Sequence, residues 1–201
     1  MKFEEHIPSE YTVIAESKDH FRIELIKKVG TDDQTQLINL SMELEEIFGP
    51  HSQLSENKIN KYFNESNMPF IARNKGEIIG YIIGIPLEKF SQESWSHYDT
   101  NLGKNNTLYT HAFVFKKLYR KKGAYAKTLK RVYINWARKK GYNYITGHVS
   151  EGISKKFSSN IEIVKLFPTW YGCKKPFEYY RRQILSVTIW KINFLVYYIN
   201  L

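Results

Sequence analysis

The sequence predicts a mixed α/β sheet with helices on its faces. Apolar runs and segments of helical periodicity alternate in the order β-α-α-β-β-β-α-β-α-β-β. The run TLYTHAFVF at 107–115 is apolar on both faces, as expected of a central strand. Between 123 and 140 the apolar side chains recur at helical spacing. With 201 residues, 42% of them hydrophobic, the chain is long enough to bury one core, and we expect a single domain over 1–201.

Each element has a local signal. Gly49-Pro50 and Gly141 end helices, Ser55 is a helix cap, and Asn74-Lys75-Gly76 is a hairpin turn. The expected elements are strands at 11–17 and 21–29 (the first an N-terminal extension within 1–19), a helix capped by Asp32 or Asp33 and running to about Phe48, a helix at 56–66, strands at 69–73 and 77–86, a polar and partly helical loop at 87–106, the strand 107–115, the helix 123–140, a strand at 142–149, a helix from about Asn160 to Trp170, and strands to the C-terminus.

Composition also limits where the protein works. Its one cysteine, Cys173, excludes an intramolecular disulfide and suits a reducing compartment, and the start MKFEEHIPSE lacks a secretory apolar segment. The C-terminal run ILSVTIWKINFLVYYINL raises the question of a membrane span. Lys191, Asn193 and Asn200 interrupt it, so paired core strands are the favoured reading. We expect a cytoplasmic protein without a membrane segment.

Charge is distributed unevenly along the chain. Residues 1–100 carry 10 basic and 17 acidic side chains, net −7, whereas residues 101–201 carry 20 and 3, net +17. No acidic residue occurs between Lys116 and Lys140, where the sequence reads YRKKGAYAKTLKRV around a glycine. A helix starting near Gly123 presents free backbone N–H groups and the positive end of its dipole. The pattern therefore predicts a phosphate or pyrophosphate site, although a solvated basic surface is the simpler alternative.

The arrangement strand, Arg-x-x-Gly, helix resembles the acyl-CoA loop of the GNAT superfamily of N-acetyltransferases. The family pattern [QR]-x-x-G-x-[GA] reads here Arg120-Lys121-Lys122-Gly123-Ala124-Tyr125, with Tyr125 in place of Gly or Ala and Ala126 one position later. The element order over about 20–190, the segment from Asn160 to KLFPTWYGC, and the closing Tyr179-Tyr180-Arg181-Arg182 are also similar to the family.

The resemblance implies a largely antiparallel GNAT sheet with a V-shaped opening between its two central strands, where acetyl-CoA binds as acyl donor. It also implies the parts of the cofactor site. Backbone groups of the strand would lie along the pantetheine arm, the loop would wrap the pyrophosphate, and the next helix would touch the cofactor. The implied cofactor residues are Phe113, Val114, Phe115, Arg120, Lys121, Lys122, Gly123, Ala124, Tyr125, Ala126, Asn160 and Phe167.

Acetyl transfer to an amine needs a neutral nitrogen. An amine of pKa about 10.4 is free in only about one part in two thousand at pH 7, a handicap of about 4.6 kcal/mol. His111, on the central strand, is the candidate base because an imidazole titrates near neutrality. The order His-Ala-x-x-Val is similar to the arylalkylamine N-acetyltransferases, whose strand histidines help to remove the amine proton. The alternative is a core histidine between Tyr109 and Phe113.

The departing thiolate needs less help, because a thiol of pKa about 8.5 costs only about 2 kcal/mol to leave unprotonated at pH 7. Many family members use a tyrosine seven residues after the asparagine, and that position is Phe167 here. Tyr171 is the candidate substitute, with core or pocket wall as its alternative role. Cys173 reads as an inert thiol, and the histidines lack the spacing of metal ligands, so no metal is expected.

For the acceptor, the resemblance places the first two helices beside the substrate. Glu43 and Glu46 on the first helix would then favour a cationic amine such as a polyamine, a lysine, an amino sugar or an arylalkylamine, unless they belong to an exposed acidic face. Trp95 and Tyr98 could shape the pocket. The expected partners are acetyl-CoA and the amine, with a homodimer as a further possibility.

Two other functions compete with this one. A basic nucleic-acid-binding protein would use the aromatic, positively charged C-terminal half, but the lysines gather at one helix start and no RNA-binding signature is present, so nucleic acid is an unlikely partner. A non-catalytic CoA-binding regulator of the same fold would explain Phe167 and Tyr125.

Overall fold

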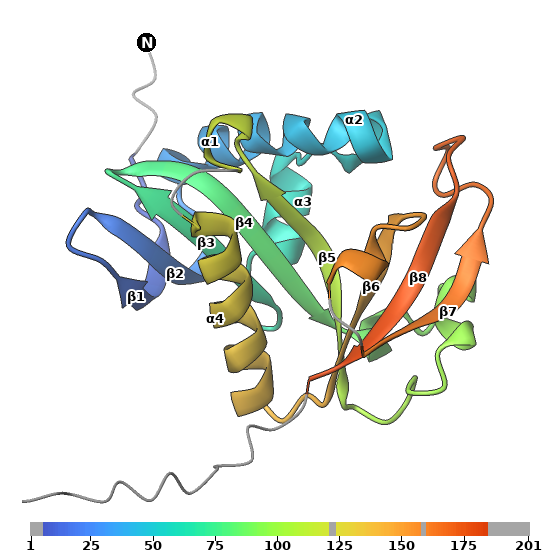
Figure 1. Cartoon of the computed structure of the whole chain (residues 1–201). Helices are drawn as coiled ribbons and strands as arrows, with labels where there is room; N and C mark the ends of the chain where they lie inside the picture. Colours follow the sequence, from blue (N-terminus) through green and yellow to red (C-terminus); the bar gives the residue numbers. More distant parts are fainter. Residues whose placement is uncertain (1–5, 121–123, 158–159, 185–201) are drawn as a thin grey trace, which may run out of the picture.

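A single eight-stranded sheet forms the centre of the molecule (Figure 1). The structure is a computed structural model and describes residues 6–120, 124–157 and 160–184. The strand order is β1-β2-β3-β4-β5-β6-β8-β7, and among these pairs only β5 and β6 run parallel. The strands are β1 (Glu10–Glu16), β2 (Phe21–Lys28), β3 (Met68–Asn74), β4 (Glu77–Pro86), β5 (Thr107–Phe115), β6 (Tyr144–Ser150), β7 (Ile161–Phe167) and β8 (Phe177–Gln183).

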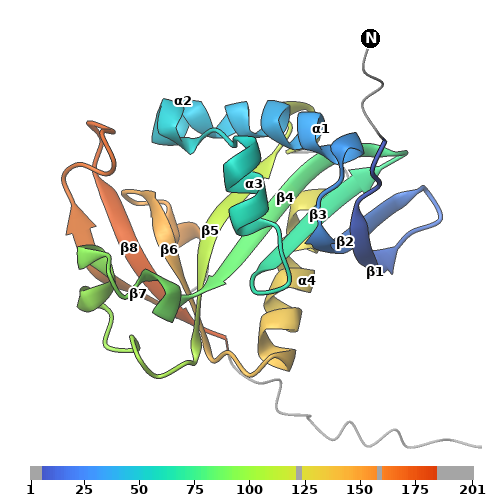
Figure 2. The same ribbon diagram turned by 180° about the vertical axis from the view of Figure 1, so that it is seen from behind.

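Helices cover both faces of this sheet, as predicted. Helices α1 (Thr31–Ser41), α2 (Glu45–Phe48) and α3 (Glu56–Tyr62) lie on one face, and α4 (Tyr125–Lys139) lies on the other (Figures 1 and 2). Helix α4 packs on β3 and β4 through Leu129, Tyr133 and Ala137, which are buried and spaced four residues apart. This spacing brings one apolar stripe onto the sheet and leaves the polar side of α4 to solvent.

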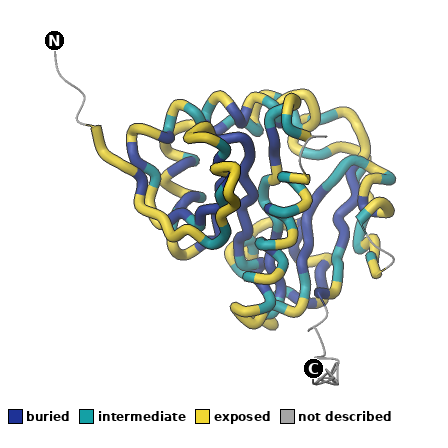
Figure 3. Tube along the Cα trace, turned by 60° about the vertical axis from the view of Figure 1, so that its left-hand side comes forward, coloured by how far each residue is buried: buried dark blue, intermediate teal, exposed yellow. Residues whose placement is uncertain are grey.

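Two apolar clusters, one on each face of β2, β3 and β4, hold the helices in place. Buried chain runs through these central strands and exposed chain lies mostly around them (Figure 3). Between β2, β3 and α1 the Arg73 guanidinium bonds the carboxylates of Glu24 and Asp33, and all three side chains are buried. The buried carboxylates in turn raise the pKa of Arg73 despite its burial. The charge network therefore fixes the register of α1 on the sheet.

Most predicted elements are confirmed, with shifted ends. The hairpin turn at Lys75 and Gly76 takes positive φ, and the Ser55 hydroxyl accepts the Lys58 N–H at the start of α3. Gly49 and Gly141 have φ of 79° and 88° where α2 and α4 end.

The first two helices differ in detail from the prediction. Gly30, not an aspartate, occupies the cap of α1, because Asp33 binds Arg73 and Asp32 accepts the Ser9 hydroxyl. The helix predicted to continue to Phe48 breaks at a 3₁₀ turn, Met42–Leu44, before α2. Helix α3 ends at Tyr62 rather than 66, since the Asn64 side-chain amide donates to carbonyls of its last turn.

The predicted helix from Asn160 to Trp170 is wrong. Residues 161–167 form β7, which pairs antiparallel with β8. Ile161, Ile163 and Val164 favour a strand, and Pro168 would break a helix in its interior. A short 3₁₀ turn, Ser154–Lys156, follows β6 instead. The predicted C-terminal strands fall mostly at 185–201, outside the described residues. In the described part of the chain, no helix is long and apolar enough to cross a membrane.

Candidate active site

The sheet opens where its two parallel strands part. β5 and β6 pair only from Thr107 with Tyr144 to Tyr109 with Thr146. Continued by two residues, this register sets His111 across from His148, but no pairing is formed there among the described residues. Gly147 permits the close approach just before the strands separate, because a Cβ there would lie 3.2 Å from the Thr110 carbonyl oxygen. The opening therefore has its apex at Tyr109.

A β-bulge lies on the same stretch of β5. Ile83 of β4 pairs with Ala112 and Gly84 pairs with Thr110, so His111 is the extra residue. A bulge bends its strand and re-aims the side chain that it carries. It also helps β5 turn away from β6, which leaves the backbone of Phe113–Phe115 paired with β4 on one edge only. The predicted pantetheine strand thus has free backbone groups toward the opening.

A large cavity, about 1330 Å³, passes through this opening. On one side of the sheet its walls come from α2, α3 and the loop around Phe90, and on the other from α4, β8 and the turn after β6. Such a volume exceeds that of usual small-molecule pockets, about 300–1,000 Å³. The cavity is therefore large enough for a coenzyme together with an acceptor.

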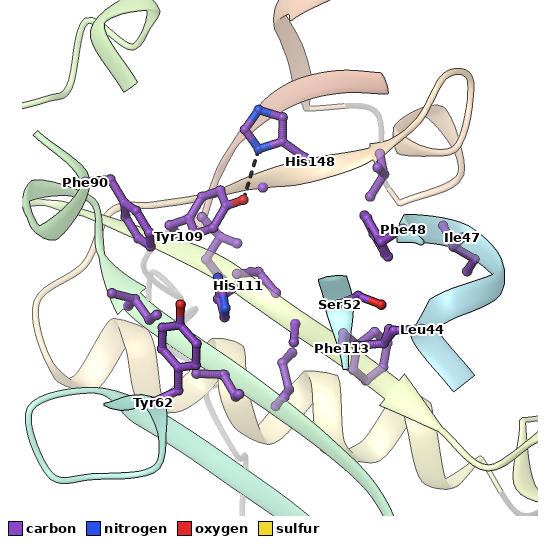
Figure 4. Close-up of a pocket in the computed structure, with 18 of the residues that line it drawn as sticks. Leu44, Ile47, Phe48, Ser52, Tyr62, Phe90, Tyr109, His111, Phe113 and His148 are labelled. Atoms are coloured by element: carbon purple, nitrogen blue, oxygen red, sulfur yellow. Dashed lines mark hydrogen bonds between the residues drawn. The ribbon is translucent and has the colours of Figure 1, made fainter. Parts of the chain in front are cut away.

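His111 stands between the two halves of the cavity (Figure 4). Its ring lies 4.2 Å from that of Tyr62 and 6.3 Å from those of Phe90 and Tyr109, measured between centroids. Burial, aided by the charges of Lys61 and Lys58, lowers the pKa of His111 to about 4. The imidazole is consequently neutral at pH 7 and has a lone pair available for a proton.

A second buried histidine faces the apex from β6. The Tyr109 hydroxyl lies 3.0 Å from His148 Nδ1, and both side chains are buried (Figure 4). Burial lowers the pKa of His148 to about 2, so the ring is neutral, and its tautomer decides whether Nδ1 accepts the phenol proton or donates to the phenol oxygen. Burial also raises the pKa of Tyr109, which remains a protonated phenol. The pair fixes a hydroxyl at the apex of the opening.

The predicted anion loop has its centre, Lys121, Lys122 and Gly123, outside the described residues, and neither Arg120 nor the described residues 124–126 are among those that line the cavity. Arg120 donates to the Phe115 carbonyl oxygen at 2.9 Å and to Glu43 at 2.6 Å. Ala124 takes φ 54°, so the chain turns sharply into α4. Thus Arg120 is tied to the end of β5.

The departure from the family pattern at Tyr125 is accommodated by the core. Its ring packs against Phe21 of β2 at 4.7 Å and Tyr119 at 6.0 Å, and Ala126 packs on the same cluster. The tyrosine side chain, at the start of α4, is thus partly buried against this core cluster.

Two cations that the motif does not contain face the cavity from the α4 side. Lys130, on the second turn of α4, lies 3.7 Å from the centroid of the Phe157 ring. Burial, and next the charge of Arg182, lower the pKa of Lys130 to about 8. Among the described residues, neither Lys130 nor Arg182 forms an ion pair with a carboxylate. Two like charges held close without a counter-ion are a favourable place for a ligand anion.

The predicted acceptor carboxylates lie elsewhere. Glu43 binds Arg120, and Glu46 binds Lys117 at 2.5 Å. Hydrogen bonding to Lys117 lowers the pKa of Glu46. Neither carboxylate is among the described residues that line the cavity. The two pairs join the start of the anion loop to the helices on the opposite face.

The remaining predicted residues are divided between wall and core. Tyr171 lines the cavity, and its hydroxyl donates to Glu93 at 3.0 Å; burial raises its pKa, followed by the bond to Glu93. Phe167 packs behind the cavity against His148 and Trp170, and Asn160 is exposed just before β7. Neither Phe167 nor Asn160 is among the described lining residues, and the helix that suggested their roles is absent.

Several site residues escaped the sequence reasoning. Tyr109 and His148 were hidden because their pairing spans 39 residues, although both lie on predicted strands. Lys130 looked like one more solvated lysine. Trp95 was correctly suspected and lines the cavity, whereas Tyr98 does not appear in the described lining. The described residues hold no cluster of three or more histidines, cysteines or carboxylates that could bind a metal.

A mixed sheet opened between two parallel strands, with a basic helix start beside the opening, defines an acyl-CoA-binding transferase. The model of the acetyltransferase (GNAT) family matches residues 35–155, more than half of the chain. The protein belongs to this family and is an acetyltransferase that uses acetyl-CoA. The resemblance noted in the sequence is thereby confirmed.

Solved structures agree with the fold. A GCN5-related N-acetyltransferase from Kribbella flavida has a TM-score of 0.61 at 13% identity, covering 83% of this chain and 99% of the other. The ribosomal-protein-S18-alanine N-acetyltransferase from Escherichia coli gives 0.58 at 12%, covering 83% and 95%. An aminoglycoside 6'-N-acetyltransferase complexed with coenzyme A gives 0.57 at 15%, covering 82% and 97%. No curated protein sequence matches the chain significantly.

Proposed function

We propose that the protein transfers the acetyl group of acetyl-CoA directly to a primary amine, with His111 as the base. The observation that carries this proposal is the position of His111. It is the bulged residue of β5, it lies just beyond the apex of the opening, and its neutral ring faces the cavity.

The cavity itself favours a neutral amine. The burial and the lysine charges that lower the pKa of His111 act on any cation placed beside it. An amine bound there therefore loses its proton to solvent more readily than in water, so the site selects the neutral form. The cost of about 4.6 kcal/mol at pH 7 then falls on binding rather than on the chemical step.

Acetyl transfer forms one bond and breaks another. The amine nitrogen forms a bond to the acetyl carbon, the C–S bond breaks, and the thiolate leaves with the bonding electrons. As the C–N bond forms, the nitrogen becomes acidic enough to give a proton to His111 Nε2 or Nδ1. A phenol returns a proton to the thiolate. Tyr109, held at the apex by its hydrogen bond with His148, is better placed for this than Tyr171, which is 60% exposed; in this role the His148 Nδ1–H donates to the phenol oxygen, so the phenol proton is left for the thiolate.

Binding of the donor uses the other half of the cavity. Free backbone groups of Phe113–Phe115 would accompany the pantetheine arm, and Arg120 with the loop that follows would hold the pyrophosphate. Lys130 and Arg182 add a cationic wall for a phosphate group, next to the apolar Phe157. These two cations would replace the cofactor contacts expected from the helix at Asn160, which does not form.

The test is a thiol-release assay with acetyl-CoA and a panel of amines, comparing wild type with His111→Gln. We expect turnover with at least one amine and a loss of about 10²–10⁴-fold in kcat for the variant, the range of general base catalysis. Equal kcat values would reject His111 as the base. Acetyl-CoA binding without thiol release on any amine would instead favour the non-catalytic regulator.

A further inference from the structure

The acceptor half of the cavity is walled by aromatic rings. Around His111 stand Tyr62 at 4.2 Å and Phe90 at 6.3 Å, and Phe90 lies 4.8 Å from Tyr109 and 5.2 Å from Trp95 (Figure 4). The rings come from α3, from the loop after β4 and from β5, so three separate elements converge on one wall. An acceptor nitrogen that approaches His111 on this side must carry a body that tolerates flat apolar contact.

The wall continues away from His111 toward the outer edge of the sheet. Trp95 lies 6.1 Å from Trp170, and Trp170 lies 4.8 Å from Tyr171, centroid to centroid. Trp95 is buried, whereas Tyr171 is 60% exposed. The aromatic wall therefore runs from an enclosed end near the base to an open end at Tyr171.

Negative charge is scarce in this cavity. Glu93 is the one carboxylate among the described residues that line it, and its oxygen accepts the Tyr171 hydroxyl at 3.0 Å. Lys58, Lys61 and Lys89 line the same half. A polycation would bring several ammonium groups to a single carboxylate and would be repelled by the lysines.

Two of these lysines are held by the fold. Lys58 donates to two backbone carbonyls of the loop before α3, at 2.6 and 2.7 Å, and Lys89 donates to Ser66 and Asn67. Lys61 lies 5.4 Å from the centroid of the Tyr62 ring. The positive charge of this wall is thus fixed in place by local structure.

We infer that the acceptor is a primary monoamine carried on an aromatic or similarly flat apolar body, which stacks along the wall from Tyr62 to Trp95 while its nitrogen reaches His111. This inference rests on the proposed function and narrows it. Polyamines, and aminoglycosides that carry several amino groups, are disfavoured by charge, since each additional ammonium lacks a carboxylate partner among the described residues that line this half. An amine on a flexible aliphatic chain is admitted but binds more weakly, because it forgoes ring stacking.

Four amines separate these classes in the thiol-release assay: 2-phenylethylamine, n-hexylamine, spermidine and kanamycin, each at saturating acetyl-CoA. We expect kcat/KM to be highest for 2-phenylethylamine, about tenfold above n-hexylamine, and at least 100-fold above spermidine and kanamycin. A highest value for spermidine or kanamycin would overturn the inference and leave the transferase function intact.

A variant tests the wall itself. Tyr62→Leu keeps an apolar side chain and removes the ring, so KM for 2-phenylethylamine should rise about tenfold while KM for n-hexylamine changes less than threefold. The matched control is Tyr11→Leu, which removes a partly exposed ring on β1, far from the cavity, and should change neither constant. Equal effects of Tyr62→Leu on both amines would contradict stacking.

A binding measurement separates failure of the inference from failure of the proposed function. In the CoA complex, 2-phenylethylamine should change the tryptophan fluorescence of the wild type, and Trp95→Phe should abolish most of this change. Saturable binding without thiol release would keep the acceptor class and reject the transferase proposal for this site. If 2-phenylethylamine does not bind and no thiol is released, both the inferred acceptor class and the proposed function are overturned.

Discussion

Replacing Lys130 by methionine should make the ligand-free protein more stable and its complex with acetyl-CoA weaker. The pKa of Lys130 falls from 10.5 to about 8 because the side chain is buried and lies near Arg182. Keeping this ammonium charged in the fold costs about 3 kcal/mol by that difference. Methionine fills a similar volume and forgoes only the contact with Phe157, worth about 1 kcal/mol. The expected gain in unfolding free energy at pH 7 is therefore about 1–2 kcal/mol.

The sign of the pH dependence follows from the same shift. Between about pH 8 and 10.5 the unfolded chain holds the Lys130 proton and the folded chain releases it, so wild-type stability rises with pH in this window. The advantage of the variant should shrink over that range and vanish near pH 10.5. Denaturant unfolding of both proteins at pH 7, 9 and 10 measures the effect.

The affinity of Lys130→Met for acetyl-CoA should fall, although its stability rises. A charge-assisted hydrogen bond to a phosphate contributes about 1.5–3 kcal/mol, so the Kd for acetyl-CoA should rise roughly 10- to 100-fold in Lys130→Met. Arg131→Met, which removes an exposed cation one residue further along the same helix, is the control and should change Kd less than threefold. Isothermal titration calorimetry at fixed salt measures the Kd of acetyl-CoA for both variants. An unchanged Kd for the Lys130 variant would refute its assignment to the donor half of the cavity.

Four further tests address other parts of the protein. Because the pKa of His111 lies at about 4, log kcat/KM should climb with a slope near one from pH 6 to 9, following deprotonation of the amine, and an inflection between pH 6 and 7 would show a histidine titrating normally. Tyr109→Phe should lower kcat by about tenfold with little change in the Kd for acetyl-CoA, as measured by single turnover and titration; an unchanged kcat would remove the phenol from the reaction. The depressed pKa values of His111 and His148 mean that the unfolded chain binds protons below pH 6.5 and the folded chain does not, so unfolding free energy should fall by about 2 kcal/mol per histidine between pH 7 and 5, and a flat profile would contradict their burial. Finally, Arg73→Met should cost about 3–5 kcal/mol by leaving Glu24 and Asp33 unpaired, measurable by thermal unfolding, and a neutral outcome would show that the carboxylates find other partners.

Local signals in the sequence were sufficient for most of the fold. The hairpin turn at Lys75-Gly76, the cap at Ser55 and the stop at Gly141 each depend on a few neighbouring residues, and the structure confirms all three. The helix predicted at 160–170 is a strand instead. Its β-branched residues, Ile161, Ile163 and Val164, and the proline at 168 are local signals for a strand, and the structure follows them.

Only part of the site could be predicted from the sequence, for a physical reason. The basic loop and His111 lie within twelve residues of each other, so spacing along one strand and turn reveals them. His148, the partner of Tyr109, lies on another strand. Glu43 pairs with Arg120, which is 77 residues away in the sequence. Charge patterns predicted that Glu43 and Glu46 would attract a cation. In the fold their carboxylates neutralise Arg120 and Lys117 instead, which no local pattern could show.

The loss of the predicted helix after β6 and the cationic pair on the donor side are two aspects of one arrangement. A strand, β7, occupies the place in the chain where an asparagine-bearing helix was expected, and it pairs with β8 at the sheet edge. That pairing leaves the turn Ser154–Lys156 and Phe157 facing α4, so the donor half of the cavity is bounded by Phe157, Lys130 and Arg182. Without the predicted helix at Asn160, its contacts to the cofactor must come from other residues. Lys130 and Arg182, which form no ion pair among the described residues, lie beside the Phe157 ring and suit a phosphate attached to an apolar arm. Under the proposed function, the same geometry separates the charges of the two halves: a donor phosphate would neutralise Lys130 and Arg182, whereas the acceptor side would keep its lysines and select an uncharged nitrogen.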